Sequence, residues 1–237
     1  MKSGGIKLNY KNTMKITFIS DTHNKHKYLT SNAYNNILGS GDVLVHSGDI
    51  SSLGKHYEIQ NFLNWFAHTD FKHKIFIAGN HDFGFENGFK IDQDFKDMGV
   101  IYLQDNEVTI DGVKFYGSPW QPEFHNWAFN LPRGEKLAEK WSEIPTDTDI
   151  LITHGPAYGI LDYVPYGGHV GCEELYKKVF EVKPKIHVCG HIHDSYGQKS
   201  IDGVEFLNAS VLDESYEYAN KPIVVDFNIE TKEVSYA

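Results

Sequence analysis

The chain has 237 residues, of which 41% are hydrophobic and 23% charged, a composition typical of a globular domain rather than a disordered segment. Its net charge of −10 argues against general nucleic-acid binding and membrane-surface binding, because both favour basic proteins. The two cysteines form no C-x-x-C pair, and the sequence contains neither a secretory signal nor an apolar run of about 18 residues. We therefore expect a cytoplasmic protein that acts on a small molecule.

Short apolar runs rich in β-branched residues alternate with amphipathic stretches along the chain. Strands buried on both faces are predicted over residues 15–20, 43–46, 74–78, 150–153 and 186–189. Helices with apolar residues three and four apart are predicted over residues 57–68, 134–144 and 173–182. Strands of a hairpin region that turns at Asp111-Gly112 are predicted over residues 100–103, 107–110 and 113–116. Two later strands are predicted over residues 204–208 and 222–228. This pattern predicts an α/β fold with antiparallel additions, in a single domain over residues 14–237 behind a short leader, residues 1–13.

Polar side chains that can bind metal follow each of the five buried strands. Ligands of α/β sheets bind beyond the carboxyl ends of the strands, so these side chains are expected to meet at one place. The set comprises Asp21, His23, Asp49, Asn80, His154, His191 and His193. Its oxygen and imidazole donors suit Mn, Fe or Zn. Seven donors are too many for one tetrahedral ion and suit two adjacent ions that share a carboxylate.

Single members of this set also have ordinary structural explanations. Asp49 is a possible cap of the next segment, Asn80 a turn residue, and a single histidine after a strand is more often structural. Residues two apart point to the same side of an extended segment. This spacing predicts that Asp21 and His23 can converge on one ion, and that His191 and His193 can do the same. Five strand ends with suitable donors favour a metal site over turn chemistry.

The order of these motifs resembles the calcineurin-like metallophosphoesterases, whose pattern is D-x-H, G-D, G-N-H-[DE], a single H and G-H-x-H. The matching segments are Asp21-Thr22-His23, Gly48-Asp49, Gly79-Asn80-His81-Asp82, His154 and Gly190-His191-Ile192-His193. The resemblance implies a four-layer α/β/β/α sandwich with mixed sheets, helices on the outer faces and the site at one sheet edge.

The resemblance also implies a role for each residue at the site. One metal would be held by Asp21, His23 and His193, the other by Asn80, His154 and His191, with Asp49 bridging the two. A hydroxide between the metals would be the nucleophile. His81 would stabilise the transition state or protonate the leaving alkoxide. Asp82 would either orient the ring of His81 or serve as a turn residue.

Residues away from the metals indicate a branch of the family. The segment that follows Asp49 contains no arginine, whereas protein Ser/Thr phosphatases of this superfamily grip phosphate with an arginine there. The short, acidic chain also argues against a DNA-repair nuclease. Segments 116–130, 154–162 and 190–197 resemble the metallophosphoesterase-domain-containing group, which is linked to hydrolysis of cyclic nucleotides and related phosphodiesters. Some animal members of that group lack one histidine of G-H-x-H, and this chain keeps both.

An aromatic segment with two prolines follows the hairpin. Its rings either wall a cleft and stack on a base or aryl group, or pack in the core, as aromatic side chains more often do. The candidate substrate contacts are Trp120, His125, Trp127 and Asn208, with a strand-end turn as the alternative for Asn208. The histidines interpreted as structural are His46, His169 and His187.

Together these features predict an enzyme that hydrolyses small phosphodiesters, cyclic nucleotides or similar, with two divalent metal ions. The alternatives are a broad phosphomonoesterase or phosphotriesterase, and a non-catalytic binding module that keeps the same fold.

Overall fold

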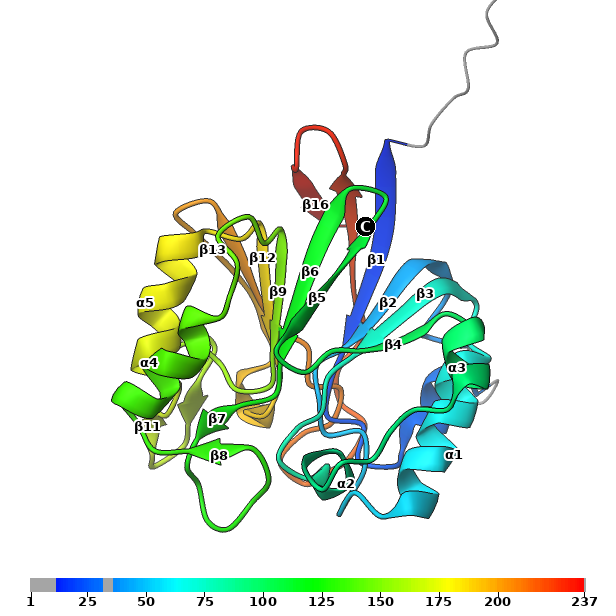
Figure 1. Ribbon diagram of the computed structural model, residues 1–237, viewed down its shortest axis with the longest axis horizontal. Coiled ribbons are helices and arrows are strands. Elements are labelled where there is room, and N and C mark those ends of the chain that lie inside the picture. The colour runs from blue at the N-terminus through cyan, green and yellow to red at the C-terminus, as the bar shows by residue number, and fades with distance from the viewer. Residues whose placement is uncertain (1–11, 32–35, 237) are drawn as a thin grey trace, which may run out of the picture.

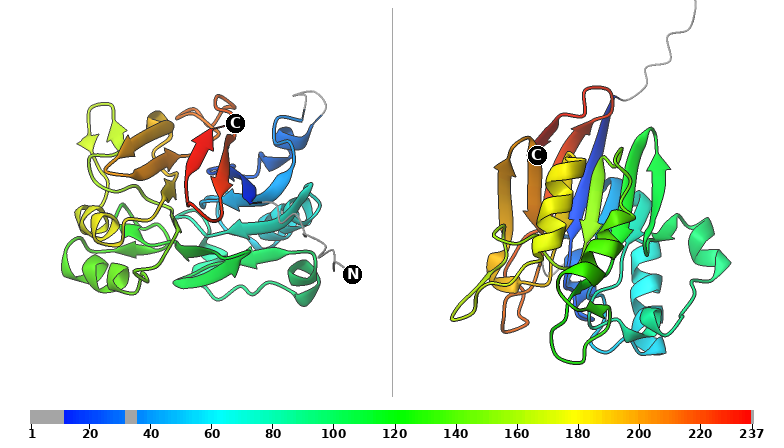
Figure 2. Two further views of the ribbon diagram at one scale, coloured as in Figure 1. Left: turned by 90° about the horizontal axis from the view of Figure 1, so that it is seen from above. Right: turned by 60° about the vertical axis from the view of Figure 1, so that its left-hand side comes forward.

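Two six-stranded mixed sheets pack face to face in the computed structural model, and helices cover their outer faces (Figure 1). The structure describes residues 12–31 and 36–236, so the predicted leader lies outside the described residues except for Asn12 and Thr13. Seen from above, the same four layers run from α4 and α5 through the two sheets to α1 (Figure 2). The predicted α/β/β/α sandwich is therefore confirmed.

The first sheet contains four parallel strands with an antiparallel pair at one edge. In spatial order its strands are β16 (Val234–Tyr236), β15 (Ile223–Asn228), β1 (Thr13–Ile19), β2 (Gly41–His46), β3 (Phe71–Phe76) and β4 (Val100–Tyr102). β1 to β4 run parallel, whereas β15 runs antiparallel to both β1 and β16. The helices on this side are α1 (His56–Ala67), α2 (Phe83–Glu86) and α3 (Gln93–Asp97).

The second sheet also has four parallel strands, but here one antiparallel strand lies at each edge. In spatial order its strands are β13 (Gly197–Ile201), β14 (Val204–Asn208), β12 (Ile186–Cys189), β9 (Ile150–Thr153), β6 (Val113–Ser118) and β5 (Asn106–Ile110). The helices α4 (Glu135–Ser142) and α5 (Glu173–Val182) cover it (Figure 1). Two short ribbons, β7 (Gln121–Pro122) with β8 (Asn130–Leu131) and β10 (Tyr163–Val164) with β11 (Gly168–His169), lie near its lower edge.

Alternating side chains along the strands explain why the central strands are largely apolar on both faces. Ile16, Phe18 and Val45 pack in the core between the sheets. Leu44 and Phe76 belong to the core under α1. Because each strand is buried on both faces, both sets of alternating positions must be apolar.

The secondary structure agrees with the predicted elements, with one error of pairing. Residues 173–182, 150–153 and 186–189 form elements with the predicted bounds. The grouping of residues 100–103 with the hairpin is wrong, because β4 pairs in parallel with β3 in the other sheet. The Asp-Gly turn specifies only the pairing of β5 with β6. The elements that were not predicted, such as α2 and β7, are too short to show a periodicity.

The carboxyl ends of the parallel strands of both sheets open onto the same edge of the sandwich (Figure 1). A parallel β-bridge between Ser20 and Ser210, which follow β1 and β14, joins the two sheets there. Within the described residues, none of the helices has the length and apolarity needed to span a membrane.

Candidate metal centre

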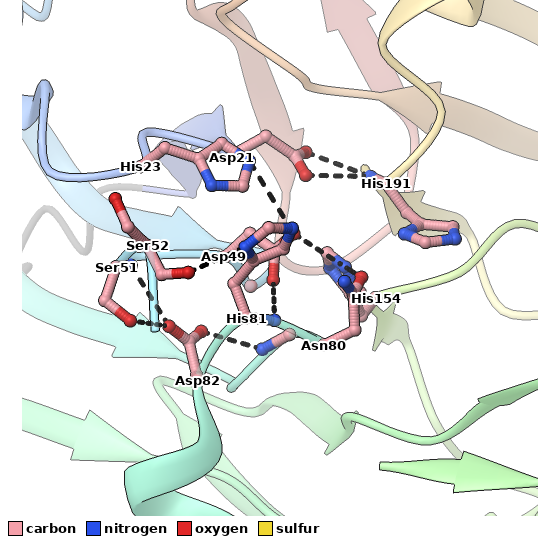
Figure 3. Close-up of polar contacts among 12 residues, drawn as sticks. Asp21, His23, Asp49, Ser51, Ser52, Asn80, His81, Asp82, His154 and His191 are labelled. Atoms are coloured by element: carbon pink, nitrogen blue, oxygen red, sulfur yellow. Dashed lines mark hydrogen bonds and ion pairs between the residues drawn. The ribbon is translucent and has the colours of Figure 1, made fainter. Parts of the chain in front are cut away.

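The predicted metal ligands follow strand ends on both sheets and meet at this edge (Figure 3). Asp21 and His23 follow β1, Asp49 follows β2, Asn80 follows β3, His154 follows β9, and His191 and His193 follow β12. Ligand atoms of Asp21, His23 and His193 lie within 4.8 Å of one another, as do those of Asp49, His154 and His191. The carbonyl oxygen of the Asn80 side chain lies 2.9 Å from His154 Nε2. The two groups match the two ligand sets that the family resemblance implies.

The carboxylate of Asp49 lies between these two groups. Its Oδ1 accepts a hydrogen bond from the backbone N–H of His81 at 2.8 Å. Its Oδ2 lies 3.7 Å from His23 Nε2, 3.4 Å from His154 Nε2 and 4.0 Å from His81 Nε2. One oxygen is thus held by the backbone, and the other faces imidazoles of both groups, as the predicted bridging role requires.

Three imidazoles at the site are oriented by backbone carbonyl groups. The Nδ1 atoms of His154, His193 and His81 lie 3.0, 2.7 and 2.8 Å from the carbonyl oxygens of Ser47, Asp213 and Ser52. A carbonyl can only accept, so each Nδ1 carries a proton that it donates to the carbonyl, and each Nε2 faces the centre. Histidines that bind metal are held by a hydrogen bond of this kind.

Two further observations fit a pair of cations at this place. His23 Nε2 is buried and has no hydrogen-bond partner within the described residues, although it faces the carboxylate oxygens. The donors are carboxylates, imidazoles and one amide, a mixture that suits divalent transition metals. The residues therefore fit the metals that the family implies.

The D-x-H segment (Asp21 and His23) and the H-x-H segment (His191 and His193) do not adopt the extended backbone geometry that the sequence predicts. Asp21, His23 and His191 have φ angles of 54°, 39° and 67°, and Asp49 has 56°, all in the left-handed region. His193 begins a short 3-10 helix, His193–Ser195. The ligands converge because tight loops redirect the chain after each strand, at a cost of about 1–3 kcal/mol per strained residue. Hydrogen bonds from Asp21 N to Gly48 O and from His23 N to Asp49 O hold the first two loops together.

Two glycines next to ligands leave the space that this crowding requires. A Cβ atom on Gly79 would overlap the carboxylate of Asp49 and the ring of His154. A Cβ atom on Gly190 would overlap the carboxylate of Asp21 and the side chain of Ser20. The glycines of G-N-H and G-H-x-H therefore serve close packing of the two sheets at the site.

The two buried carboxylates remain ionised because imidazoles surround them. Burial by itself raises the pKa of Asp49, but the charges of His154, His23 and His81 outweigh it and hold the pKa well below its ordinary value. The pKa of Asp21 is lowered against burial in the same way, chiefly by its hydrogen bond with His193. In return, Asp49 raises the pKa of His154 to about 9 against the effect of burial. Such a site is built to hold positive charge.

Of the two alternatives for Asp82, its hydrogen bonds favour a role in the loop, because the ring of His81 is held at Nδ1 by the carbonyl oxygen of Ser52. The carboxylate of Asp82 accepts hydrogen bonds from the backbone N–H groups of Gly79, Ile50 and Ser51 and from the hydroxyl of Ser51. Burial, together with the charge of Asp49, raises the pKa of Asp82 to about 7. Asp82 instead ties the loop after β2 to the loop after β3 (Figure 3).

A cavity of about 670 Å³ opens beside the predicted metal ligands, and two of the four candidate substrate contacts line it. Trp127 and His125 do so, together with Phe124. The ring of Trp127 lies 4.1 Å from the ring of His81 at 31°. The aromatic segment thus reaches the site, although Phe129 of the same segment is fully buried.

The other two candidate contacts lie outside the residues that line this cavity. Trp120 donates from Nε1 to Asp105 at 2.8 Å, and Lys140 lies over its ring. Asn208 is fully buried and donates to the carbonyl oxygen of Ile192 at 2.8 Å while accepting from the N–H of Ser210. It therefore supports the loop that carries His191 and His193.

Sequence reasoning missed several residues at the cavity, because their contacts join distant segments. Tyr216 lines the cavity, and its ring lies 4.8 Å from that of His23 and 5.4 Å from that of His193. Arg133, the sole arginine of the chain, also lines it. No motif marks either residue. Ser210 donates a hydrogen bond to Asp21 Oδ2 at 2.7 Å. It lies two residues after the candidate Asn208, so the sequence could have indicated this residue alone.

Comparisons with known proteins agree with this site. The sequence profile described as calcineurin-like phosphoesterase matches residues 14–195. The human protein "Metallophosphoesterase domain-containing protein 1" is 42% identical over 236 residues, which cover 90% of this chain and 70% of that protein. A UPF0046 protein of Caenorhabditis elegans is 37% identical and covers 89% of this chain and 74% of its own length.

Solved structures show the same fold at low sequence identity. The protein TT1561 of Thermus thermophilus superposes with a TM-score of 0.60 and 12% identity over 95% of this chain and 98% of that one. Phosphopantetheinyl hydrolase from Mycobacterium tuberculosis gives a TM-score of 0.54 and 18% identity over 85% and 90%. From the profile match, the curated relatives and this fold, the chain belongs to the calcineurin-like phosphoesterase family.

Proposed function

We propose that the protein is a metal-dependent phosphoesterase that hydrolyses small phosphodiesters, cyclic nucleotides or similar. The observation that carries this proposal is the pair of donor groups that meet at Asp49, beside a cavity with aromatic and acidic walls. A broad phosphomonoesterase or phosphotriesterase is the alternative with the same metal chemistry.

Two divalent cations, Mn, Fe or Zn, would be held by residues of both sheets. Asp21, His23 and His193 are proposed for one ion, Asn80, His154 and His191 for the other, and Asp49 for both. When bound, such a pair lowers the pKa of water and neutralises charge on the phosphate oxygens.

His81 is proposed as the acid that protonates the leaving oxygen. Its Nδ1–H is held by the carbonyl oxygen of Ser52, so the proton that moves belongs to Nε2. Nε2 points to the centre and lies 4.0 Å from Asp49 Oδ2. Its side chain is 15% exposed, which leaves it open to the cavity.

The charges around the cavity support a monoanionic diester over a dianionic monoester. Arg133 is already paired with Glu173 at 2.6 Å and with two backbone carbonyl groups. Three exposed carboxylates, those of Glu123, Asp194 and Glu214, also line the cavity. They repel a second negative charge on the phosphate, whereas the second ester group of a diester adds no such charge.

Trp127 is proposed to form the wall against which the leaving group packs. A leaving oxygen that takes its proton from His81 must lie beside that ring, and Trp127 packs on it. Phe124 and His125 extend the same wall. A flat base or aryl group fits this surface, because aromatic rings stack on it favourably.

Hydrolysis of a panel of substrates tests the proposed function. With Mn²⁺, the purified protein should hydrolyse bis-p-nitrophenyl phosphate and cyclic AMP with a higher kcat/KM than p-nitrophenyl phosphate. A clear preference for the monoester would favour the broad phosphomonoesterase. No hydrolysis of any substrate, with fewer than two metals bound per chain, would favour a non-catalytic binding module.

Replacement of the shared carboxylate should empty the site. Asp49→Ala is expected to lose both metals and nearly all activity, because one carboxylate serves both ions. Metal content measured by elemental analysis, together with kcat, checks this. Asp147→Ala removes an exposed carboxylate paired with Lys114 and should retain both metals and the wild-type rate. Retention of two metals by Asp49→Ala would refute the bridging role.

Loss of the proposed acid should slow turnover without loss of metal. His81→Ala is expected to lower kcat by about 10²–10⁴-fold, the range for a lost general acid. The defect should be smaller with p-nitrophenol, which needs little protonation, than with an alkoxide leaving group. His68→Ala, at an exposed histidine on the far end of α1, serves as the control. An empty metal site in His81→Ala would contradict the assignment.

Truncation of the proposed wall should weaken binding of a base and spare the phosphate. Trp127→Leu is expected to raise the inhibition constant of AMP by about tenfold, because stacking on a base contributes about 1–3 kcal/mol. The inhibition constant of ribose 5-phosphate, which has no base, should not change. Trp120→Phe, outside the cavity lining, is the matched control. Equal effects on both inhibitors would show that Trp127 does not contact the base.

A further inference from the structure

Two buried histidines outside the ligand set are each hydrogen-bonded to a threonine of a ligand loop. His46 Nε2 lies 2.9 Å from Thr22 Oγ1, and His187 Nε2 lies 2.8 Å from Thr153 Oγ1. All four side chains are at most 1% exposed. The bonds are therefore shielded from water, which could otherwise replace either partner.

The two pairs occupy equivalent places in the two halves of the sandwich. Thr22 lies in the loop after β1, between two ligands of one donor group, and His46 ends the adjacent strand β2. Thr153 ends β9, directly before the ligand His154, and His187 lies in the adjacent strand β12. One pair thus stands behind each donor group.

The outer core holds each ring in place. The ring of His46 packs edge to face on Phe62 at 5.2 Å. The ring of His187 packs in the same manner on Phe206 at 5.6 Å. Each histidine therefore offers its threonine a fixed partner that belongs to a rigid strand.

The direction of the second bond follows from the protons available. Thr153 Oγ1 donates its single proton to the carbonyl oxygen of Gly155 at 2.7 Å. The oxygen must then accept from His187 Nε2–H, which leaves Nδ1 as the unprotonated ring atom, without a hydrogen-bond partner among the residues that the structure describes. The result is a chain from His187 through Thr153 to Gly155 that spans the ligand His154 on both sides.

We propose that the His46–Thr22 and His187–Thr153 pairs are positioning residues, one for each of the two metals. The first fixes the position of the loop that carries Asp21 and His23 relative to the end of β2. The second holds His154. Both loops need an external contact that fixes their position. Asp21 and His23 have strained left-handed backbone conformations, and His154 lies in a turn directly after β9. The inference rests on the metal binding in the proposed function and does not depend on hydrolysis.

The test compares three substitutions that each replace a buried threonine hydroxyl by a methyl group. Thr22→Val and Thr153→Val remove the bonds to His46 and His187. Thr17→Val is the matched control, because Thr17 is fully buried in β1 and its hydroxyl has no hydrogen-bond partner in the described part of the chain. Each full-length protein is stripped with a chelator and titrated with Mn²⁺, and the Tm of its metal-free form is recorded.

Each single variant is expected to weaken one of the two Mn²⁺ binding steps by roughly 10–100-fold, the usual effect of losing a group that orients a metal ligand. The double variant should weaken both steps, and Thr17→Val should bind as the wild type. Thr22→Ser and Thr153→Ser keep the hydroxyl and should restore the affinity. If a valine variant does not fold, His46→Phe and His187→Phe remove the same bonds from the opposite side.

Wild-type Mn²⁺ affinity in both valine variants would overturn the proposal. A fall in the Tm of the metal-free protein without a change in affinity would also overturn it, because that result describes a purely structural bond. The titration involves no turnover, so an absence of diester hydrolysis by the wild type would refute the proposed function and leave this inference standing.

Discussion

The carboxylate of Asp49 imposes the constraint on which the rest of the site depends. It is buried where the two sheets meet, with one oxygen held by the N–H of His81 and the other facing imidazoles from both sheets. A buried carboxylate is stable only beside positive charge or strong donors. The imidazole of His154 from the second sheet supplies this charge, and His23 from the first sheet faces the same oxygen, so the site holds together only if both sheets end at the same edge.

The fold meets this constraint by repeating one arrangement in each sheet. Four parallel strands per sheet end at the common edge, and a short polar loop follows each strand that carries a ligand. Glycines at positions 79 and 190 allow these loops to approach closely. Four of the predicted ligands adopt left-handed backbone conformations, so the protein spends stability on the site and recovers it in hydrogen bonds between loops.

Much of this was predictable from the sequence, because buried parallel strands and their polar ends are local features. The donors Asp21, Asp49 and His154 stand out because each lies within three residues of the end of a predicted strand. The backbone conformation of the loops was not predictable, because side-chain spacing alone suggests an extended segment. The sequence leaves the role of Asp82 open for a related reason: its partners, at Ile50 and Ser51, lie about 30 residues earlier in the chain.

The residues that line the cavity are the part of the site that the sequence predicts least well, and they are also the part that contacts the substrate in the proposed function. The metal donors follow strands of the core, whereas the walls come from loops: the segment of Trp127, the segment of Val170 and the segment of Tyr216. Loops tolerate change that a packed strand end does not. Relatives can therefore keep the metal centre and differ in the ester they accept. In this chain the acidic and aromatic walls, more than the metal ligands, support the proposed preference for a small diester with a flat leaving group.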